Sequence, residues 1–361
     1  MSSPPAAAAR SEPSRGCAVV VAALALLTLG GLLLLLTLQQ SLSWWSLLLA
    51  LGLVLLGGGI FAAHRRTLAA GAVLLLAPWV VRAWLVRGDE SHALVTLPSG
   101  ESSRLLNRLY PEPDGARAAA ALLELRGGRD DSEFSKLPEI LLKAYERADP
   151  AASSLPTPAI ATYLGLQSPQ AFDTLVLRPP PQRVSADAAV VLLHGYAGNF
   201  YVYCWEMAQA AAAANLVTLC PSTSPSGAWW EPAGAQIVER TLDYAHDIGM
   251  NRVYLAGLSN GAAGASELAI TLADRLAGLV LISGGRAASP PRLPVLVIQG
   301  AADRMMPAES ARSYARGRGN VQYHERPGGH FVFLSDTPAV RPIIARFLSD
   351  LEKRATTLRR P

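Results

Sequence analysis

Three residues in the second half of the chain have the types that acyl-transfer chemistry needs, and the first is a serine. Ser259 lies in Gly257-Leu258-Ser259-Asn260-Gly261, between a predicted strand and an alanine-rich predicted helix. The small flanking residues allow a sharp turn that lifts the hydroxyl clear of a sheet, and a helix N-terminus stabilises developing negative charge. We therefore expect Ser259 to be a nucleophile. A glycine-rich turn with a capping serine is the alternative interpretation.

The other two residues are a candidate base and a candidate acid. A serine hydroxyl is a poor nucleophile without a base, and His330 directly follows the last predicted strand. Asp303 follows another predicted strand, and an acid is needed to orient the imidazole and stabilise its charged form. The order Ser259, Asp303, His330 is one that Ser–Asp–His enzymes use, so these are the predicted catalytic residues. Asp336 is the rival acid, but its position is typical of a helix N-cap.

The remaining histidines have ordinary interpretations as surface or core groups. The chain has six histidines. His64 lies in an apolar region, His92 before the predicted sheet, His246 in a predicted helix and His324 within a predicted strand. None of these four competes with His330 for the role of base.

A glycine-containing loop, His194-Gly195-Tyr196-Ala197-Gly198-Asn199, follows an earlier predicted strand. Backbone N–H groups from such a loop and from the residue after the nucleophile commonly bind a developing oxyanion. We expect Tyr196 and Asn260 to supply these two donors and His194 to organise the loop. A turn residue with no role is the alternative for His194.

Two adjacent indoles, Trp229 and Trp230, lie in the loop after a third predicted strand, at the expected edge of the site. They could line a pocket for an acyl or aromatic group. Packing of the loop onto the next helix is an equally good interpretation.

From about residue 172 onwards, short apolar runs alternate with helical patterns, which is typical of a mainly parallel sheet covered on both faces. Ligands of such sheets bind beyond the carboxyl ends of the strands, where Ser259, Asp303 and His330 all fall. The seven predicted strands are residues 172–177, 189–193, 216–219, 253–256, 278–283, 295–298 and 321–325.

The motifs HGYAGN, GLSNG, QGAAD and PGGH resemble those of the α/β-hydrolase superfamily, over residues 172–352. Within it they are similar to small serine esterases, including dienelactone-hydrolase-like and polyester-depolymerase-like enzymes. The resemblance implies an α/β-hydrolase fold and ester hydrolysis through an acyl-enzyme on Ser259. With seven strands, the usual first strand is expected to be missing. The segment 283–294 is too short for a cap domain, which predicts an open site.

The N-terminal region is apolar, and half of all residues in the chain are hydrophobic. Residues 17–38 and 42–63 are uncharged runs longer than the ~18 residues that can cross a bilayer as a helix. A third run, 67–86, contains Arg82 near its end, where a long side chain can reach the interface. We expect two to three transmembrane helices. A signal peptide is the alternative for the first run, and a buried or interfacial helix for the third.

Charge predicts the orientation of these helices. Before residue 89 there are six arginines and one glutamate, whereas the remainder has 26 basic and 27 acidic residues. Arg10, Arg15, Arg65 and Arg66 place the N-terminus and the second interhelical loop in the cytoplasm. Three spans then put the C-terminal domain outside the cytoplasm, which is the favoured arrangement, and two would put it inside. The balanced charge of that domain gives no reason to expect nucleic acid as a partner.

The predicted domains are a disordered tail (1–15), a membrane region (16–88), a helical spacer and linker (89–155) and the catalytic domain (156–361). A small helical cover over the catalytic domain is the alternative for 89–155, and the linker is the Pro- and Ser-rich stretch 150–158. Cys204 and Cys220 could pair, but two small buried residues are the favoured interpretation. No metal-type cluster of cysteine and histidine occurs in the sequence, and no cofactor is expected.

The sequence therefore predicts a membrane-anchored serine hydrolase acting on an ester-type small molecule or lipid. A thioesterase, amidase or peptidase would use the same three residues, since the triad does not encode the leaving group. A membrane scaffold with a catalytically dead hydrolase fold is the alternative outside enzymes. The oligomeric state is left open.

Overall fold

The computed structural model describes residues 15–127, 134–148, 155–180, 187–286 and 289–358. It divides into two compact units, Met1–Val81 and Arg82–Pro361, called the N-terminal and C-terminal units below. The predicted disordered tail lies outside the described residues, apart from Arg15.

The three apolar runs form helices α1 (Arg15–Gln39), α2 (Trp44–Phe61) and α3 (Arg65–Leu85), and the boundary between the units falls inside α3. All three are long and apolar enough to cross a membrane. The backbones approach closely at glycines: a Cβ at Gly57 would lie 2.9 Å from the carbonyl oxygen of Ala23, and one at Gly71 2.5 Å from the amide nitrogen of Leu56. Small residues at helix contacts are typical of packing in lipid, where no hydrophobic force drives association.

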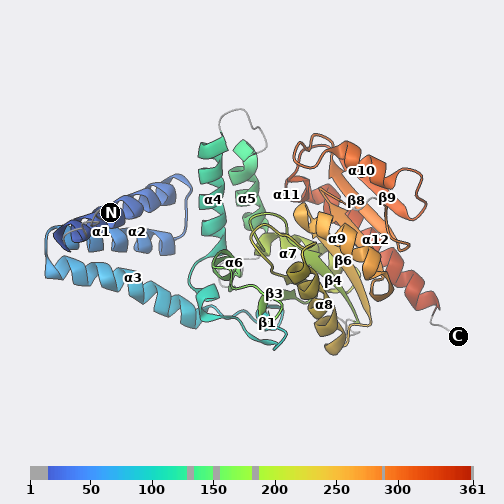
Figure 1. Ribbon diagram of the computed structural model, residues 1–361, viewed down its shortest axis with the longest axis horizontal. Helices are drawn as coiled ribbons and strands as arrows, with labels where there is room; N and C mark the ends of the chain where they lie inside the picture. The colour runs from blue at the N-terminus through green and yellow to red at the C-terminus, as the bar shows by residue number, and fades with distance from the viewer. Residues whose placement is uncertain (1–14, 128–133, 149–154, 181–186, 287–288, 359–361) are drawn as a thin grey trace, which may run out of the picture. The chain divides into compact units, whose positions relative to one another are not determined.

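The C-terminal unit is built on one nine-stranded sheet with the order β2-β1-β3-β5-β4-β6-β7-β8-β9 (Figure 1). The strands from β5 through β9 pair in parallel, and β1 and β3 pair antiparallel at one side. The sheet confirms the predicted fold class. The strand bounds are β1 His92–Leu97, β2 Glu101–Ser102, β3 Phe172–Leu177, β4 Ala188–Leu193, β5 Val217–Pro221, β6 Arg252–Leu258, β7 Gly278–Ile282, β8 Val295–Gly300 and β9 Val321–Arg326.

The sheet has nine strands and not the seven predicted, and the first strand, which was expected to be missing, is present. The strand β1 pairs antiparallel with β3 over its whole length, and the short β2 pairs with β1. The segment His92-Ala-Leu-Val-Thr-Leu97 is rich in apolar and β-branched residues, which favour a strand. Its partner lies about 80 residues further along the chain, so only the tertiary structure identifies the pairing. His92 is therefore part of the sheet rather than before it.

Helices cover both faces of the sheet (Figure 1). Side chains from α7, α11 and α12 pack with α4 and α5 into one core, and those from α8, α9 and α10 form the core on the opposite face. The helix bounds are α4 Glu112–Gly127, α5 Leu137–Arg147, α6 Ala159–Tyr163, α7 Tyr201–Ala212, α8 Pro232–Asp247, α9 Asn260–Thr271, α10 Ala308–Ala315, α11 Val332–Ser335 and α12 Thr337–Leu358.

The predicted helical spacer, residues 89–155, is integrated into this unit, which corrects its description as a spacer. It contains β1 and β2 as well as α4 and α5. The buried carboxylate of Glu112, the first residue of α4, accepts hydrogen bonds from the Tyr145 and Thr157 hydroxyls at 2.7 and 2.8 Å. It also accepts from the backbone N–H groups of Tyr201 and Val202. Glu112 thus caps the N-terminus of α7, a favourable position for a carboxylate.

The described end of the predicted linker is buried. Residues 149–154 lie outside the described part of the chain, and residues 155–158 are buried. The described end of the Pro- and Ser-rich stretch is therefore packed into the unit and is no exposed linker.

The connection between β7 and β8 forms no helix in its described residues. This agrees with the prediction that no cap domain is inserted at this point of the sheet.

Candidate active site

Ser259 occupies the turn between β6 and α9, in a strained backbone conformation. Its φ is +54°, in the left-handed region that non-glycine residues rarely adopt. A Cβ at Gly257 would overlap the carbonyl oxygen of Gly261, and a Cβ at Gly261 would overlap that of Leu193. The two glycines of the pattern are therefore required because β4, β6 and α9 come too close for any larger residue. The turn stores strain in order to present the hydroxyl.

The structure brings the three predicted catalytic side chains together. Nε2 of His330 lies 2.9 Å from Oγ of Ser259. Nδ1 of His330 lies 3.0 and 3.2 Å from the two carboxylate oxygens of Asp303. All three residues are buried. These are hydrogen-bond distances, so the hydroxyl, imidazole and carboxylate form one chain from nucleophile to acid.

Asp303 is held by the loop after β8. Oδ1 accepts hydrogen bonds from the backbone N–H groups of Met305 and Met306, at 2.9 and 2.8 Å. Oδ2 accepts one from the side-chain amide of Gln299 at 2.8 Å. These donors fix the carboxylate opposite His330, which is the orientation that an imidazole general base needs.

Three supporting residues were missed from the sequence. Gln299 is the first, and a polar residue inside the fully buried strand β8 was the available signal. Ser283 is the second, because its hydroxyl donates to the carbonyl of His330 at 2.8 Å. Tyr163 is the third: its hydroxyl donates to the carbonyl of Ala197 at 2.6 Å. Neither Ser283 nor Tyr163 lies in a motif that would have identified it.

The other acid and the other histidines have different positions. Asp336 pairs with Nε of Arg326 at 2.8 Å, and among the described residues only Asp303 has a hydrogen bond to His330 through a carboxylate. His246 and His324 lie in α8 and β9 as predicted.

His194 organises its loop, as expected from the sequence. The backbone N–H of Thr223 donates to Nε2 of His194 at 3.1 Å, so Nδ1 carries the proton and donates to the carbonyl of Gly195 at 2.8 Å. The indole N–H of Trp229 donates to the carbonyl of His194 at 2.8 Å. Burial lowers the pKa of His194 to about 4, with a small opposing contribution from the Gly195 bond. The ring is therefore neutral at physiological pH.

The predicted oxyanion donors lie next to the serine. Asn260 is the first residue of α9, and a Cβ at Gly195 would lie 3.0 Å from Cβ of Ser259, which places the loop after β4 against the nucleophile. In the described residues, the backbone N–H groups of Tyr196 and Asn260 have no hydrogen-bond acceptor. They are available to an oxygen of a substrate. The Tyr196 side chain is 72% exposed.

The two tryptophans differ, and the packing alternative applies to Trp229. Trp229 is fully buried, and a Cβ at Gly264 of α9 would overlap its side chain. Trp229 is therefore a core residue that supports His194. Trp230 is partly exposed, with the guanidinium of Arg286 4.8 Å from its ring centre. Trp230 stays a candidate substrate contact.

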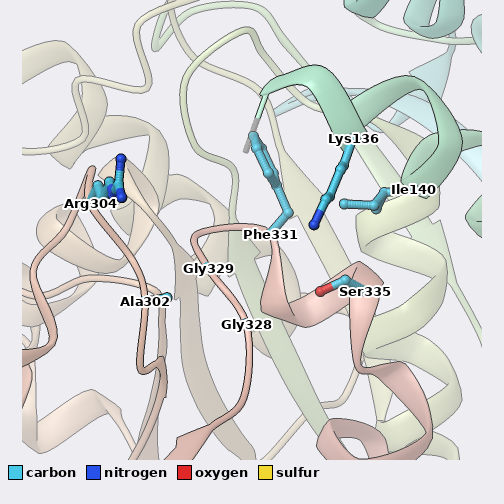
Figure 2. Close-up of a pocket in the computed structure, with 8 residues that line it drawn as sticks. All are labelled: Lys136, Ile140, Ala302, Arg304, Gly328, Gly329, Phe331 and Ser335. Atoms are coloured by element: carbon cyan, nitrogen blue, oxygen red, sulfur yellow. The ribbon is translucent and has the colours of Figure 1, made fainter. Parts of the chain in front are cut away.

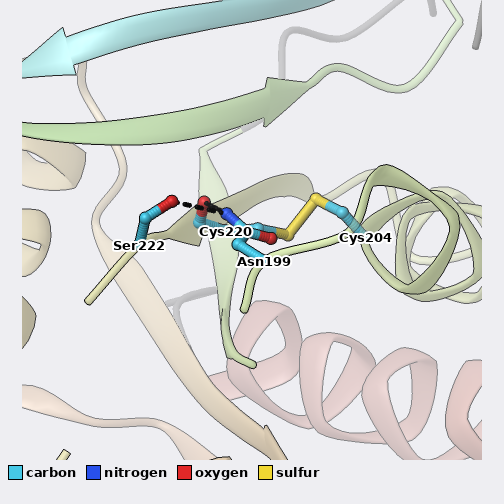
Figure 3. Close-up of a disulfide and its surroundings, with 4 residues drawn as sticks. All are labelled: Asn199, Cys204, Cys220 and Ser222. Atoms are coloured by element: carbon cyan, nitrogen blue, oxygen red, sulfur yellow. Dashed lines mark hydrogen bonds between the residues drawn. A yellow bond between two sulfur atoms is a disulfide. The ribbon is translucent and has the colours of Figure 1, made fainter. Parts of the chain in front are cut away.

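A disulfide joins Cys204 of α7 to Cys220 of β5, which corrects the interpretation of two unpaired buried cysteines (Figure 3). Their Cα atoms are 6.1 Å apart, a separation that disulfides usually span. Beside it, the amide of Asn199 donates to the carbonyl of Cys220 at 2.7 Å and to the hydroxyl of Ser222 at 3.0 Å. The end of the loop after β4 is thus fixed to β5 near the disulfide that joins β5 to α7.

Comparison with known sequences finds no protein-family model and no curated protein that matches the chain. Comparison with solved structures finds a thermostable esterase, at 19% identity over 50% of this chain and 59% of that one, with a TM-score of 0.41. Est1E from Butyrivibrio proteoclasticus, solved with ferulic acid bound, is 14% identical over 50% and 96%, with a TM-score of 0.43. A serine hydrolase without a lid from Xanthomonas campestris is 17% identical over 50% and 88%, with a TM-score of 0.41.

The strand order and the serine turn of the chain itself give the C-terminal unit an α/β-hydrolase fold. The first strand of that fold, expected to be missing, is β1.

Proposed function

We propose that the chain is a membrane-anchored serine hydrolase that cleaves carboxylic esters through an acyl-enzyme on Ser259. The observation that carries the proposal is the continuous hydrogen-bonded chain from Ser259 through His330 to Asp303. A serine on a strained turn, with two free backbone donors beside it, is the arrangement that acyl transfer requires.

In the proposed reaction, Nε2 of His330 takes the proton of the Ser259 hydroxyl as Oγ attacks the ester carbonyl. The N–H groups of Tyr196 and Asn260 bind the resulting oxyanion. When the carbonyl re-forms, the carbon–oxygen bond to the alcohol breaks, and the alcohol leaves with the proton that His330 carried. Water then attacks the acyl-enzyme with His330 again as base, which releases the carboxylic acid and restores the serine.

The choice of esters follows the resemblance of the sequence motifs to serine esterases, since the three side chains do not encode the leaving group. Among the similar structures, one is called an esterase and another a serine hydrolase. The absence of a helix between β7 and β8 in the described residues supports an open site.

The membrane location rests on three helices that are long and apolar enough to cross a bilayer. We place the C-terminal unit outside the cytoplasm, in line with the arginine distribution. The buried Cys204–Cys220 disulfide supports this orientation, because disulfides persist in oxidising compartments and are rare in the cytosol.

A fluorophosphonate probe tests the chemistry, and a membrane-impermeant version of it tests the orientation. Intact cells should be labelled without permeabilisation, and Ser259→Ala should abolish labelling while Ser313→Ala, a change in α10 away from the serine turn, leaves it unchanged. Labelling that survives Ser259→Ala would refute the proposal. A panel of p-nitrophenyl esters, thioesters and anilides then measures the preference for the leaving group.

A further inference from the structure

A cavity of about 330 Å³ lies against the acid and base of the candidate site (Figure 2). Small-molecule sites commonly have volumes of ~300–1,000 Å³. Its walls come from the start of α5 and from the loops that follow β8 and β9. The lining residues are Lys136, Ile140, Ala302, Arg304, Gly328, Gly329, Phe331 and Ser335.

The cavity borders the catalytic groups through their neighbours in sequence. Ala302 and Arg304 flank Asp303, while Gly329 and Phe331 flank His330. The rings of His330 and Phe331 meet edge to face, with centroids 5.6 Å apart. In ester cleavage the alcohol leaves with a proton from the base, so the alcohol part of the substrate must lie on the side of His330. The position of the cavity therefore suits the leaving group.

Among the described residues that line the cavity, the charged ones are both positive. They are Lys136 and Arg304, and neither has an ion-pair partner in the described part of the chain. Glu139, one turn along α5, is paired with Lys143 at 2.6 Å. Figure 2 shows the Lys136 amine beside Phe331 and Ile140, and Arg304 on the other side of the Gly329 loop. The apolar side chains of Phe331 and Ile140, which could contact the carbon atoms of a ligand, thus lie beside the charged amine of Lys136.

We propose that this cavity binds the alcohol part of the ester and selects alcohols that carry a negative charge, such as a carboxylate or phosphate. The inference rests on the proposed function, because it assigns a substrate class to the same catalytic residues. Lys136 supplies the main attraction and Arg304 a second one from the opposite wall. Ile140 and Phe331 contact the uncharged carbon atoms next to the anion.

Two acetate esters of nearly the same shape test this preference: 4-acetoxybenzoate, which is anionic, and its neutral methyl ester, whose phenol is intrinsically the better leaving group. The full chain in a non-ionic detergent should have the higher kcat/KM for the anionic ester. Lys136→Met should lower kcat/KM for that ester about tenfold, as expected for a charged hydrogen bond, and change the neutral ester less than about twofold. Arg304→Met should have the same effect at a smaller magnitude.

Lys353→Met is the matched control. Lys353 is an exposed residue of α12, about 24 Å along the helix axis from its first residue, Thr337. Its replacement should leave both esters unchanged. The neutral ester also reports folding, since a misfolded variant would lose activity towards both substrates.

The outcomes separate the two proposals. Hydrolysis of both esters with no effect of Lys136→Met or Arg304→Met would overturn the inference and leave the serine hydrolase intact. Probe labelling of Ser259 with no hydrolysis of either ester would also overturn it. An absence of both labelling and hydrolysis would overturn the proposed function itself, and the inference with it.

Discussion

Ser259 and the two residues in its hydrogen-bonded chain, His330 and Asp303, are held in place by different means. Ser259 is fixed by backbone packing, with Gly257 and Gly261 allowing three elements to meet. Asp303 and His330 are fixed by side-chain hydrogen bonds, from Gln299 and Ser283 among others. A larger residue in a close-packed turn must displace the backbone that it meets, whereas a lost hydrogen bond leaves its partner unsatisfied without adding volume. Mutations around Ser259 should therefore lower both activity and stability, whereas mutations in the hydrogen-bond network of Asp303 and His330 should lower mainly activity.

Asp303→Asn should have the largest effect and should act on chemistry alone. The amide keeps the size of the carboxylate, but it can donate to the imidazole and favour the wrong tautomer. We expect kcat to fall by about 10³-fold or more, because the wrong tautomer cannot accept the serine proton, with little change in thermal stability. Measured hydrolysis of a p-nitrophenyl ester and a melting curve check both statements.

Asp336→Asn is the control for this acid, because Asp336 pairs with Arg326 instead. It should change kcat less than about twofold. A larger loss in this variant than in Asp303→Asn would show that the acid has been misassigned.

Gly261→Ala should affect fold and activity together. The added methyl group would overlap the backbone carbonyl of Leu193, which can yield only if β4 or α9 shifts. A displacement of about 1 Å can cost about 100-fold in rate, and overpacking costs about 1–3 kcal/mol of unfolding free energy. Hydrolysis rate and melting temperature should therefore fall in the same variant.

Gly319→Ala offers the comparison, since a Cβ there has no atom within 4 Å. Wild-type activity in Gly261→Ala would contradict the conclusion that backbone packing holds the nucleophile in position.

The loop after β4 is held in a third way, by the buried side chain of His194, which must stay uncharged. The unfolded-state pKa of histidine is about 6.5, and burial lowers that of His194 to about 4. Between pH 6.5 and pH 4 the unfolded chain binds a proton that the folded chain does not. The unfolding free energy is therefore highest above pH 6.5 and falls as the pH drops through this range. This histidine should lower the unfolding free energy by about 2 kcal/mol at pH 5 relative to pH 8.

Urea unfolding of the detergent-solubilised chain at several pH values measures this effect, and His194→Gln should flatten the pH dependence. His246→Gln, a change on the exposed side of α8, should leave the dependence as it is. An unchanged slope in His194→Gln would contradict a buried neutral imidazole.

The sequence predicted the residues whose local signals agree with the fold. Ser259, Asp303 and His330 each follow a predicted strand, and parallel strands bring their carboxyl ends to one edge. Their hydrogen bonding in the structure follows from that rule, and their catalytic role stays a prediction. Six of the seven predicted strands, β3 to β8, were predicted because buried strands are continuous apolar runs. The seventh, β9, lies at the edge of the sheet and is only partly buried.

What the sequence did not predict depends on contacts between distant segments. The strand β1 is six residues long, and its partner β3 lies beyond the three helices α4, α5 and α6. Cys204 and Cys220 are separated by 16 residues, a spacing that fits a pair or two single thiols equally well. Trp229 is buried because Gly264 leaves room for it, and a tryptophan in a loop gives no sign of which side it faces.

The cap that Glu112 places on α7 determines where the protein could be trimmed for work in water. A version starting at Pro156, the predicted start of the catalytic domain, would lose that carboxylate and would uncover the edge of β3, which is fully buried in the intact chain. An exposed apolar edge strand promotes aggregation. Recombinant forms without the apolar helices should therefore begin before His92, so that they retain β1, which completes the sheet.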